Sequence, residues 1–180
     1  MRKILAIAAA AMVVATVQAV PVGWSAGNAA NYKGDAYQLF VIGQNGVTSI
    51  SQITGLLAAG TDVSTYAFGS GTVNSSGMVS MPAGSSGKSL NTGTYTSFMV
   101  FYDTAAPTPG TSKYAVASGG AQQTLTITDK SASGTFGGGN VGTTLNNTAN
   151  WSSFGPVPEP TTVALLALGL AALGLKRKVA

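Results

Sequence analysis

Short runs of hydrophobic and polar residues recur along the middle of this chain, in the pattern of β-strands. Residues 37–42 combine aromatic and β-branched side chains, and residues 123–128 alternate leucine and isoleucine with threonine. Residues 94–102 are continuously apolar at their centre, which predicts a strand buried on both faces. Further strands are predicted at residues 113–117 and, from weaker patterns, at residues 63–68 and 77–81.

One segment has the hydrophobic spacing of a helix instead. Ile50, Ile53, Leu56 and Leu57 lie at i, i+3, i+6 and i+7, and a serine at 49 or 51 can cap the start. With Gly60 as its end, the pattern predicts a short helix over residues 51–59, packed on the sheet. The Asn-Gly pair before it predicts a tight turn at residues 43–46, from which the chain either returns as a strand or enters the helix.

Two segments are predicted to be irregular. Residues 105–111 contain two prolines and must form a loop. Residues 134–150 are rich in Gly, Asn and Thr. The glycine run at 134–142 superficially resembles a phosphate cradle, but no strand-turn-helix unit surrounds it and no Lys-Ser or Lys-Thr follows, so it is interpreted as a surface loop. Trp151 and Phe154 then provide a last apolar anchor.

The spacing of these elements indicates the fold class. Roughly six to eight short strands, separated by turns, are typical of a sandwich or jelly roll. We therefore expect an all-β protein: a single antiparallel sandwich or jelly-roll-like domain with one short helix, over residues 20–156. It is flanked by a predicted N-terminal signal helix and a predicted C-terminal transmembrane helix.

The N-terminus has the three-part layout of a secretory signal peptide. A cationic start, Met1-Arg2-Lys3, precedes an apolar run over residues 4–17. Val17 and Ala19 then occupy the −3 and −1 positions of a cleavage site. Residues 1–19 are predicted to be removed, so that the mature chain starts at Val20.

The C-terminus has a second apolar segment, over residues 161–175, followed at once by Lys176, Arg177 and Lys178. As a helix it would span about 22 Å, against a hydrocarbon core of about 30 Å. It is short for a permanent span, although snorkelling basic side chains and local bilayer thinning can cover the difference. The basic triplet belongs on the cytoplasmic side, which leaves residues 20–160 outside.

The segment between domain and tail is Val157-Pro158-Glu159-Pro160. Both prolines fix φ and lack an N–H donor, so the segment is expected to be extended. Glu159 resists entering the bilayer. These features predict a stiff acidic handle at the outer membrane–water boundary, and a proline-rich hinge before a simple tail anchor is the alternative.

The motif, apolar segment and basic triplet together resemble the PEP-CTERM sorting signal, over residues 157–180 only. The resemblance implies recognition by an exosortase, a membrane-embedded cysteine protease or transpeptidase. The protein would pass through an inner-membrane intermediate, be cut, and reach the cell surface or matrix of a Gram-negative type of bacterium, often together with exopolysaccharide production. It implies nothing about the fold of residues 20–156.

Charge and composition narrow the function of the mature domain. Five of the nine basic residues lie in the two targeting segments, and the remainder of the chain before Pro158 balances four lysines against four aspartates. A basic face for nucleic acid is therefore absent. The chain has no cysteine, so no disulfide forms outside the cell.

The side chains required for catalysis are largely missing from the sequence. Histidine and cysteine are both absent, which removes the commonest general base, the strongest nucleophile and the usual zinc ligands. The sequence also contains no Asp-x-Asp spacing of the kind that would indicate a calcium site. We expect no enzyme activity, no catalytic residue, no metal and no cofactor; only carboxylates converging in a cleft would favour a hydrolase. The aspartates concerned are Asp35, Asp62, Asp103 and Asp129.

The sequence therefore favours an exported structural or interaction protein of the envelope or extracellular matrix. The alternative is a carbohydrate-binding module associated with exopolysaccharide, in which exposed aromatic side chains stack on sugar rings. The aromatic residues available for this are Trp24, Tyr32, Tyr66, Tyr95, Tyr102, Tyr114 and Trp151.

Overall fold

The apolar run around Phe98 forms the centre of the larger of two sheets. The computed structural model describes residues 19–117, 123–128 and 130–157. Six strands make up the larger sheet, in the order β10 (Trp151–Ser153), β7 (Lys113–Ala117), β6 (Gly93–Tyr102), β2 (Ala36–Val41) and β3 (Gly69–Thr72), with β8 (Gln123–Ile127) also paired to β6. All of these pairings are antiparallel.

The second sheet is built around β1 (Val20–Gly27). Antiparallel partners, β4 (Val79–Met81) and β5 (Ser89–Leu90), pair with successive parts of β1, whereas β9 (Gly134–Asn140) runs parallel to it. The all-β prediction is confirmed, but the expectation of a purely antiparallel domain is wrong at this pair. Between β1 and β9 the chain passes through five of the six strands of the larger sheet, and so long a connection allows a parallel return.

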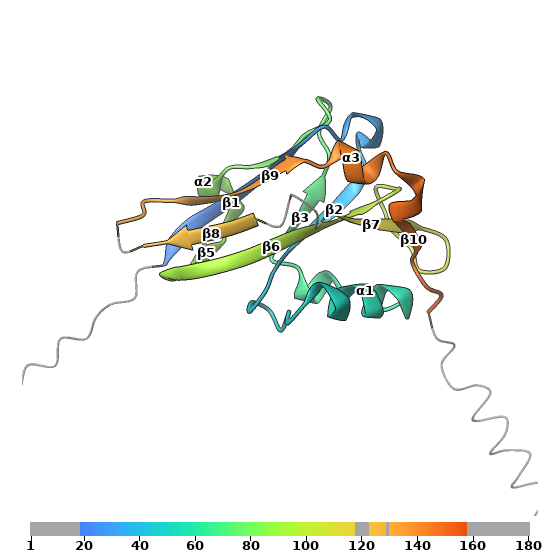
Figure 1. The fold of residues 1–180 in the computed structure, drawn as a ribbon, viewed down its shortest axis with the longest axis horizontal. Coiled ribbons are helices and arrows are strands. Elements are labelled where there is room, and N and C mark those ends of the chain that lie inside the picture. Colours follow the sequence, from blue (N-terminus) through green and yellow to red (C-terminus); the bar gives the residue numbers. More distant parts are fainter. Residues whose placement is uncertain (1–18, 118–122, 129, 158–180) are drawn as a thin grey trace, which may run out of the picture.

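The two sheets face each other across one hydrophobic core, and Figure 1 shows the smaller sheet lying over the larger one. Val22 and Trp24 of β1 project into it and are at most 2 % exposed. Leu39 of β2 and Phe101 of β6 meet them from the other side and are fully buried. Among the described residues no strand pair joins the two sheets, which are held together by the packing of this core.

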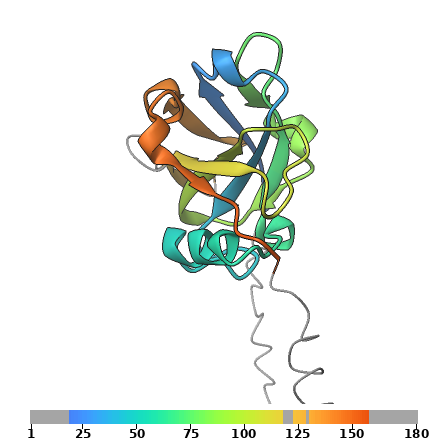
Figure 2. The same ribbon diagram turned by 90° about the vertical axis from the view of Figure 1, so that its right-hand side faces the viewer.

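A helix covers the opposite face of the larger sheet, as both Figure 1 and the turned view in Figure 2 show. Helix α1 (Ile50–Ala58) begins after Ser49, whose Oγ accepts a hydrogen bond from the Gln52 N–H at 3.1 Å, and Gly60 follows its end with a φ of 73°. Ile53 and Leu57 point into a second core that includes the fully buried Phe98 and Val100 of β6. The predicted helix and the burial of β6 on both faces are confirmed.

The expectations for two segments are wrong. The weak strand predicted at residues 63–68 is a 3-10 turn, η2 (Ser64–Tyr66), because the Asp62 carboxylate accepts hydrogen bonds from both the N–H and the hydroxyl of Ser64. The segment 134–150, expected to be irregular and to form a surface loop over 134–142, contains β9, a one-turn helix α3 (Gly142–Leu145) and a 3-10 turn η3 (Thr148–Asn150).

Strand β1 was not predicted from the sequence at all, although it is central to its sheet. The short strands β3, β5 and β10 were also not predicted, nor were the 3-10 turn η1 (Ala30–Tyr32) and the one-turn helix α2 (Ala83–Ser86). The predicted signal helix and the predicted transmembrane helix at 161–175 lie outside the described residues. Within residues 19–157, as far as they are described, no helix is long and apolar enough to cross a membrane.

We expect the core beneath α1 to make the stability of the domain sensitive to alkaline pH. Burial raises the pKa of Tyr102 well above the usual value of about 10, and Asp62 and Tyr114 contribute in the same direction. As the pH rises, the unfolded chain therefore loses the Tyr102 hydroxyl proton before the folded chain does. The contribution of this group to the free energy of unfolding is complete below pH 10 and falls as the pH rises above it. We expect urea midpoints to drop between pH 10 and 12, and to drop less steeply in Tyr102→Phe. Equal slopes in both proteins would contradict this.

Candidate functional site: the two ends of the domain

The predicted signal cleavage site falls where the fold begins. Ala19 is exposed and lies just before β1, whereas Val20 is the first residue of β1, is only 2 % exposed and pairs with Leu90. Val17, the third predicted residue of the site, lies outside the described residues. The bond expected to be cut therefore joins an exposed residue to a buried one.

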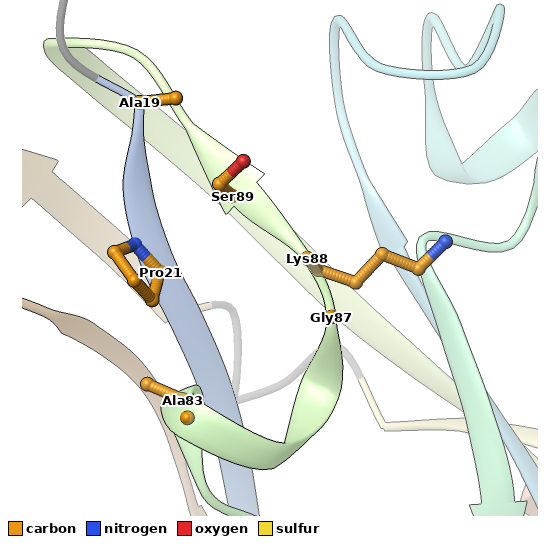
Figure 3. Close-up of a pocket in the computed structure, with 7 residues that line it drawn as sticks. Ala19, Pro21, Ala83, Gly87, Lys88 and Ser89 are labelled. Atoms are coloured by element: carbon orange, nitrogen blue, oxygen red, sulfur yellow. The ribbon is translucent and has the colours of Figure 1, made fainter.

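An open cavity of about 340 Å³ lies beside this end of the chain (Figure 3). Ala19 and Pro21 form one wall, and Ala83 and the stretch from Gly87 to Ser89 form the other. Figure 3 shows the Lys88 side chain turned away from Pro21, and its Nζ lies 6.0 Å from the centroid of the Phe68 ring. The cavity is thus lined mostly by small residues, and its charged lining residue, Lys88, does not point toward the opposite wall, so polar groups do not converge on it as they do at a specific ligand site.

The other end of the domain is held by a run of backbone hydrogen bonds. The Phe154 N–H donates to the Ser112 carbonyl at 2.9 Å, and the Phe154 carbonyl accepts from the Gly110 N–H at 2.8 Å. The Gly155 N–H then donates to the Leu57 carbonyl, at the end of α1, at 2.9 Å. We call residues 154–156 with their partners the C-terminal joint.

The predicted sorting motif starts directly after this joint. Val157 is 58 % exposed, although the ring of Phe154 three residues earlier is only 4 % exposed. Pro158, Glu159 and Pro160 lie outside the described residues, as do Lys176, Arg177 and Lys178. The structure therefore presents the first residue of the motif on the surface, next to the last residues that the fold holds.

Two glycines permit the close approach at the joint, and the sequence interpretation singled out only one of them. A Cβ at Gly155 would overlap the carbonyl oxygen of Ala58, and one at Gly60 would overlap the carbonyl oxygen of Pro156. Gly60 was predicted only as the end of the helix. The Gly-Pro pair at 155–156 was the feature of the sequence that could have indicated a constrained backbone where the chain leaves the domain.

Substitution at the joint is expected to destabilise the domain. Gly155→Ala forces the chain away from α1 and should cost about 1–3 kcal/mol, as other overpacking changes do. Gly55→Ala is the matched control, because Gly55 is exposed on the same helix and a Cβ there meets nothing within 4 Å. It should stabilise the helix by up to about 1 kcal/mol. Urea unfolding measures both, and equal effects would show that the joint is not tightly packed.

The aspartates do not gather in a described cavity. Asp35 and Asp103 lie on adjacent chain segments, since the Ala36 N–H donates to the Thr104 carbonyl at 2.9 Å. Burial raises the pKa of Asp35, and the nearby charge of Asp103 adds to the effect. Asp103 also accepts a hydrogen bond from the Lys113 N–H, and Asp129 lies outside the described residues. Among the described residues no three carboxylates come together to hold a metal ion.

Most of the candidate sugar-stacking aromatics are structural. Trp24, Tyr102 and Tyr114 are at most 5 % exposed, and the Trp24 Nε1 donates to the Tyr37 hydroxyl at 3.0 Å. Tyr66 and Tyr95 are half-buried on separate elements. Tyr32 and Trp151 are half-buried together, with ring centroids 5.2 Å apart and planes inclined by 25°.

The pair of Tyr32 and Trp151 is anchored at one point and surrounded by amides. The Tyr32 hydroxyl and the Trp151 Nε1 both donate to the Leu145 carbonyl, at 2.6 and 2.7 Å. The exposed Asn31 donates through Nδ2 to the Asn146 Oδ1 at 3.1 Å, beside this pair. Of the aromatics predicted for sugar binding, these two are the ones that the fold brings together near the surface.

Comparison with known proteins bears on the tail alone. The family described as the PEP-CTERM protein-sorting motif matches residues 156–178, a segment that begins directly after Gly155. This match confirms the resemblance of the C-terminal tail to that sorting signal. Neither the curated proteins nor the solved structures include a match to this chain. The motif indicates an exported protein that an exosortase, itself a membrane protein, processes from a membrane-anchored intermediate before surface release.

Proposed function

Because this chain carries a PEP-CTERM sorting motif, we propose that residues 20–156 form a structural or interaction domain of the cell envelope or extracellular matrix of a Gram-negative bacterium. One observation carries the proposal most directly. The exposed Val157 follows the C-terminal joint at once, so the first residue of the motif lies at the surface of the folded domain.

The domain's composition supports a non-catalytic role. The sequence contains no histidine and no cysteine, and its few charges balance outside the targeting segments. The two aspartates that interact, Asp35 and Asp103, are held by backbone contacts near the surface rather than in a described cleft. We therefore propose that the chain is not an enzyme, and that its processing chemistry comes from the exosortase.

Intact-mass measurement of the protein recovered from host envelope and medium tests the proposed function. The expected species begins at Val20 and has lost part of residues 157–180. A chain that keeps Arg2 and Lys3 would contradict the leader, and a chain that keeps Lys176, Arg177 and Lys178 in every fraction would contradict the sorting tail. The start of the chain at Val20 can also be checked by N-terminal sequencing.

A second candidate function, carbohydrate binding, is favoured by the Tyr32–Trp151 pair. Aromatic faces with adjacent amide groups are the usual means of holding a sugar ring, and Asn31, Asn146 and Asn150 provide those amides. The ligand would be a neutral hexose of the exopolysaccharide, because the domain offers few charges.

Titration of the processed protein with host exopolysaccharide tests this candidate. Trp151→Ala should weaken binding at least tenfold, and Asn31→Ala should weaken it less. Asn91→Ala, an exposed asparagine next to β5, is the matched control and should bind like the parent. Binding that survives Trp151→Ala in a folded protein would exclude this surface.

A further inference from the structure

Strand β3 lies at one edge of the larger sheet. Within the part of the chain that the structure describes, it pairs only with β2, in the antiparallel register that sets Tyr37 opposite Gly71 (Figure 1). Ser70 and Thr72 are exposed and Gly71 is half-buried. We call the side of β3 that faces away from β2 the open edge.

The hydrogen bonds around β2 show which backbone groups lie on the open edge. Directly after β2, the Ile42 N–H donates to the Thr96 carbonyl at 2.8 Å, so the even-numbered residues of β2 bond to β6. The Val73 N–H donates to the Asp35 carbonyl at 3.0 Å, so the odd-numbered residues of β2 and β3 bond to each other. The N–H and C=O groups of the two even-numbered residues of β3 therefore point away from the sheet.

The open edge lacks the usual protection of an edge strand. Soluble proteins commonly protect such strands with lysine, proline or very short length. Strand β3 contains neither of these residues, and no charged residue occurs between Asp62 and Lys88. The opposite edge of the same sheet differs, because β10 has only three residues and the Trp151 N–H donates to the Thr148 carbonyl.

The groups on the open edge are complementary to a second copy of the same edge. When two β3 strands lie antiparallel with their Gly71 residues opposite each other, Ser70 of each copy faces Thr72 of the other. Each of these pairs can exchange both of its backbone hydrogen bonds. Gly71 has no side chain to obstruct the central pair, in which the Cα atoms approach to about 4.5 Å. The four lysines and four aspartates before Pro158 balance, so two copies carry no net charge that would keep them apart.

We propose that β3 is a self-association edge, through which two copies of the domain pair antiparallel about Gly71 and join their larger sheets into one. In strand addition of this kind, backbone hydrogen bonds provide the affinity. Four residues from each copy form a small interface, so the association is weak in dilute solution and is favoured where many copies are concentrated. The proposal deepens the proposed interaction role by naming a partner, and it rests on that role only for the crowded setting of an envelope or matrix.

Disulfide trapping tests the pairing and its register, because the chain has no cysteine of its own. Ser70→Cys and Thr72→Cys are recovered from the host as processed proteins, mixed, and exposed to oxidised glutathione. In the proposed register the two substituted positions have Cα atoms about 5.5 Å apart, within the range of a disulfide. Position 70 of one copy lies about 7–8 Å from position 70 of the other, beyond that range.

The mixture should therefore form a disulfide-linked dimer about tenfold faster than either variant alone. Intact mass distinguishes the mixed dimer from dimers of a single variant. Thr94→Cys, at an exposed position of β6, is the matched control and gives the rate that random collisions produce.

A pair of lysines tests whether the open edge carries the association. Ser70→Lys with Thr72→Lys places like charges across the junction, so sedimentation should give an association constant at least about tenfold below that of the parent. Thr94→Lys with Thr124→Lys is the matched control, since both positions are exposed neighbours on paired strands, and it should associate like the parent. Far-UV circular dichroism verifies that each variant is folded.

A parent that remains monomeric at its highest soluble concentration would overturn the proposal, as would a mixture that cross-links no faster than Thr94→Cys. Cross-linking of Ser70→Cys alone at the rate of the mixture would overturn the pairing about Gly71. Association that survives the two lysines in a folded protein would exclude the open edge. None of these results affects the proposed function, because the intact mass of the recovered protein tests that function separately.

Discussion

Replacing Phe98 by alanine is expected to lower the free energy of unfolding by about 3–5 kcal/mol, the range measured for truncating a fully buried phenylalanine. Phe98 is 0 % exposed and stacks on Phe40, with ring centroids 5.2 Å apart and planes inclined by 16°. Both rings belong to the core between the larger sheet and α1. The change would leave a cavity in the layer that holds the helix to the sheet.

Urea unfolding of the processed protein measures this loss. Thr94→Ala, at an exposed position of the same strand, is the control and should change the stability by less than about 1 kcal/mol, because it removes only one exposed contact with Thr126. A loss below about 0.5 kcal/mol for Phe98→Ala would mean that α1 is not packed over this ring.

Replacing Pro158, Glu159 and Pro160 together by alanine is expected to abolish processing of the tail. Alanines permit a helix to extend through this stretch, and the change removes the charge expected at the membrane boundary. The variant should therefore stay full-length at its C-terminus and remain in the inner membrane, whereas the parent is shortened.

Immunoblots of inner-membrane, surface and medium fractions distinguish these outcomes. Pro107→Ala with Pro109→Ala is the control, since it removes two prolines from a loop of the same domain and should be processed like the parent. If the motif variant is shortened and released to the same extent as the parent, the three residues serve only as a linker.

The elements that the sequence predicted are those whose side chains carry a local pattern. Strand β6 was predictable because a short uninterrupted apolar run rich in aromatic residues favours a strand covered on both faces, and α1 because its spacing and its cap agree. The sorting motif was predictable for a different reason, since its parts follow one another along the chain. In each case the information lies within a few neighbouring residues.

The elements that the sequence did not predict depend on distant partners. Pro21 and Gly23 interrupt the apolar residues of β1, and the glycines of β9 provide no side chains for a pattern. These two strands stabilise each other although more than a hundred residues separate them, so neither is recognisable alone. The C-terminal joint is similar, because the need for glycine at 155 arises from a helix that ended near residue 58.

The position of the C-terminal joint also determines how the domain would bear a mechanical load. Any tension transmitted along residues 157–180 reaches the domain first at Gly155, whose hydrogen bond leads to the end of α1, and then at the buried ring of Phe154. Only after both give way would the pull peel β10, with its three residues, from β7. In a domain tethered by this tail, a pulling force would thus act first on the contact with α1 and on the buried Phe154 ring, before it strains any strand of the larger sheet.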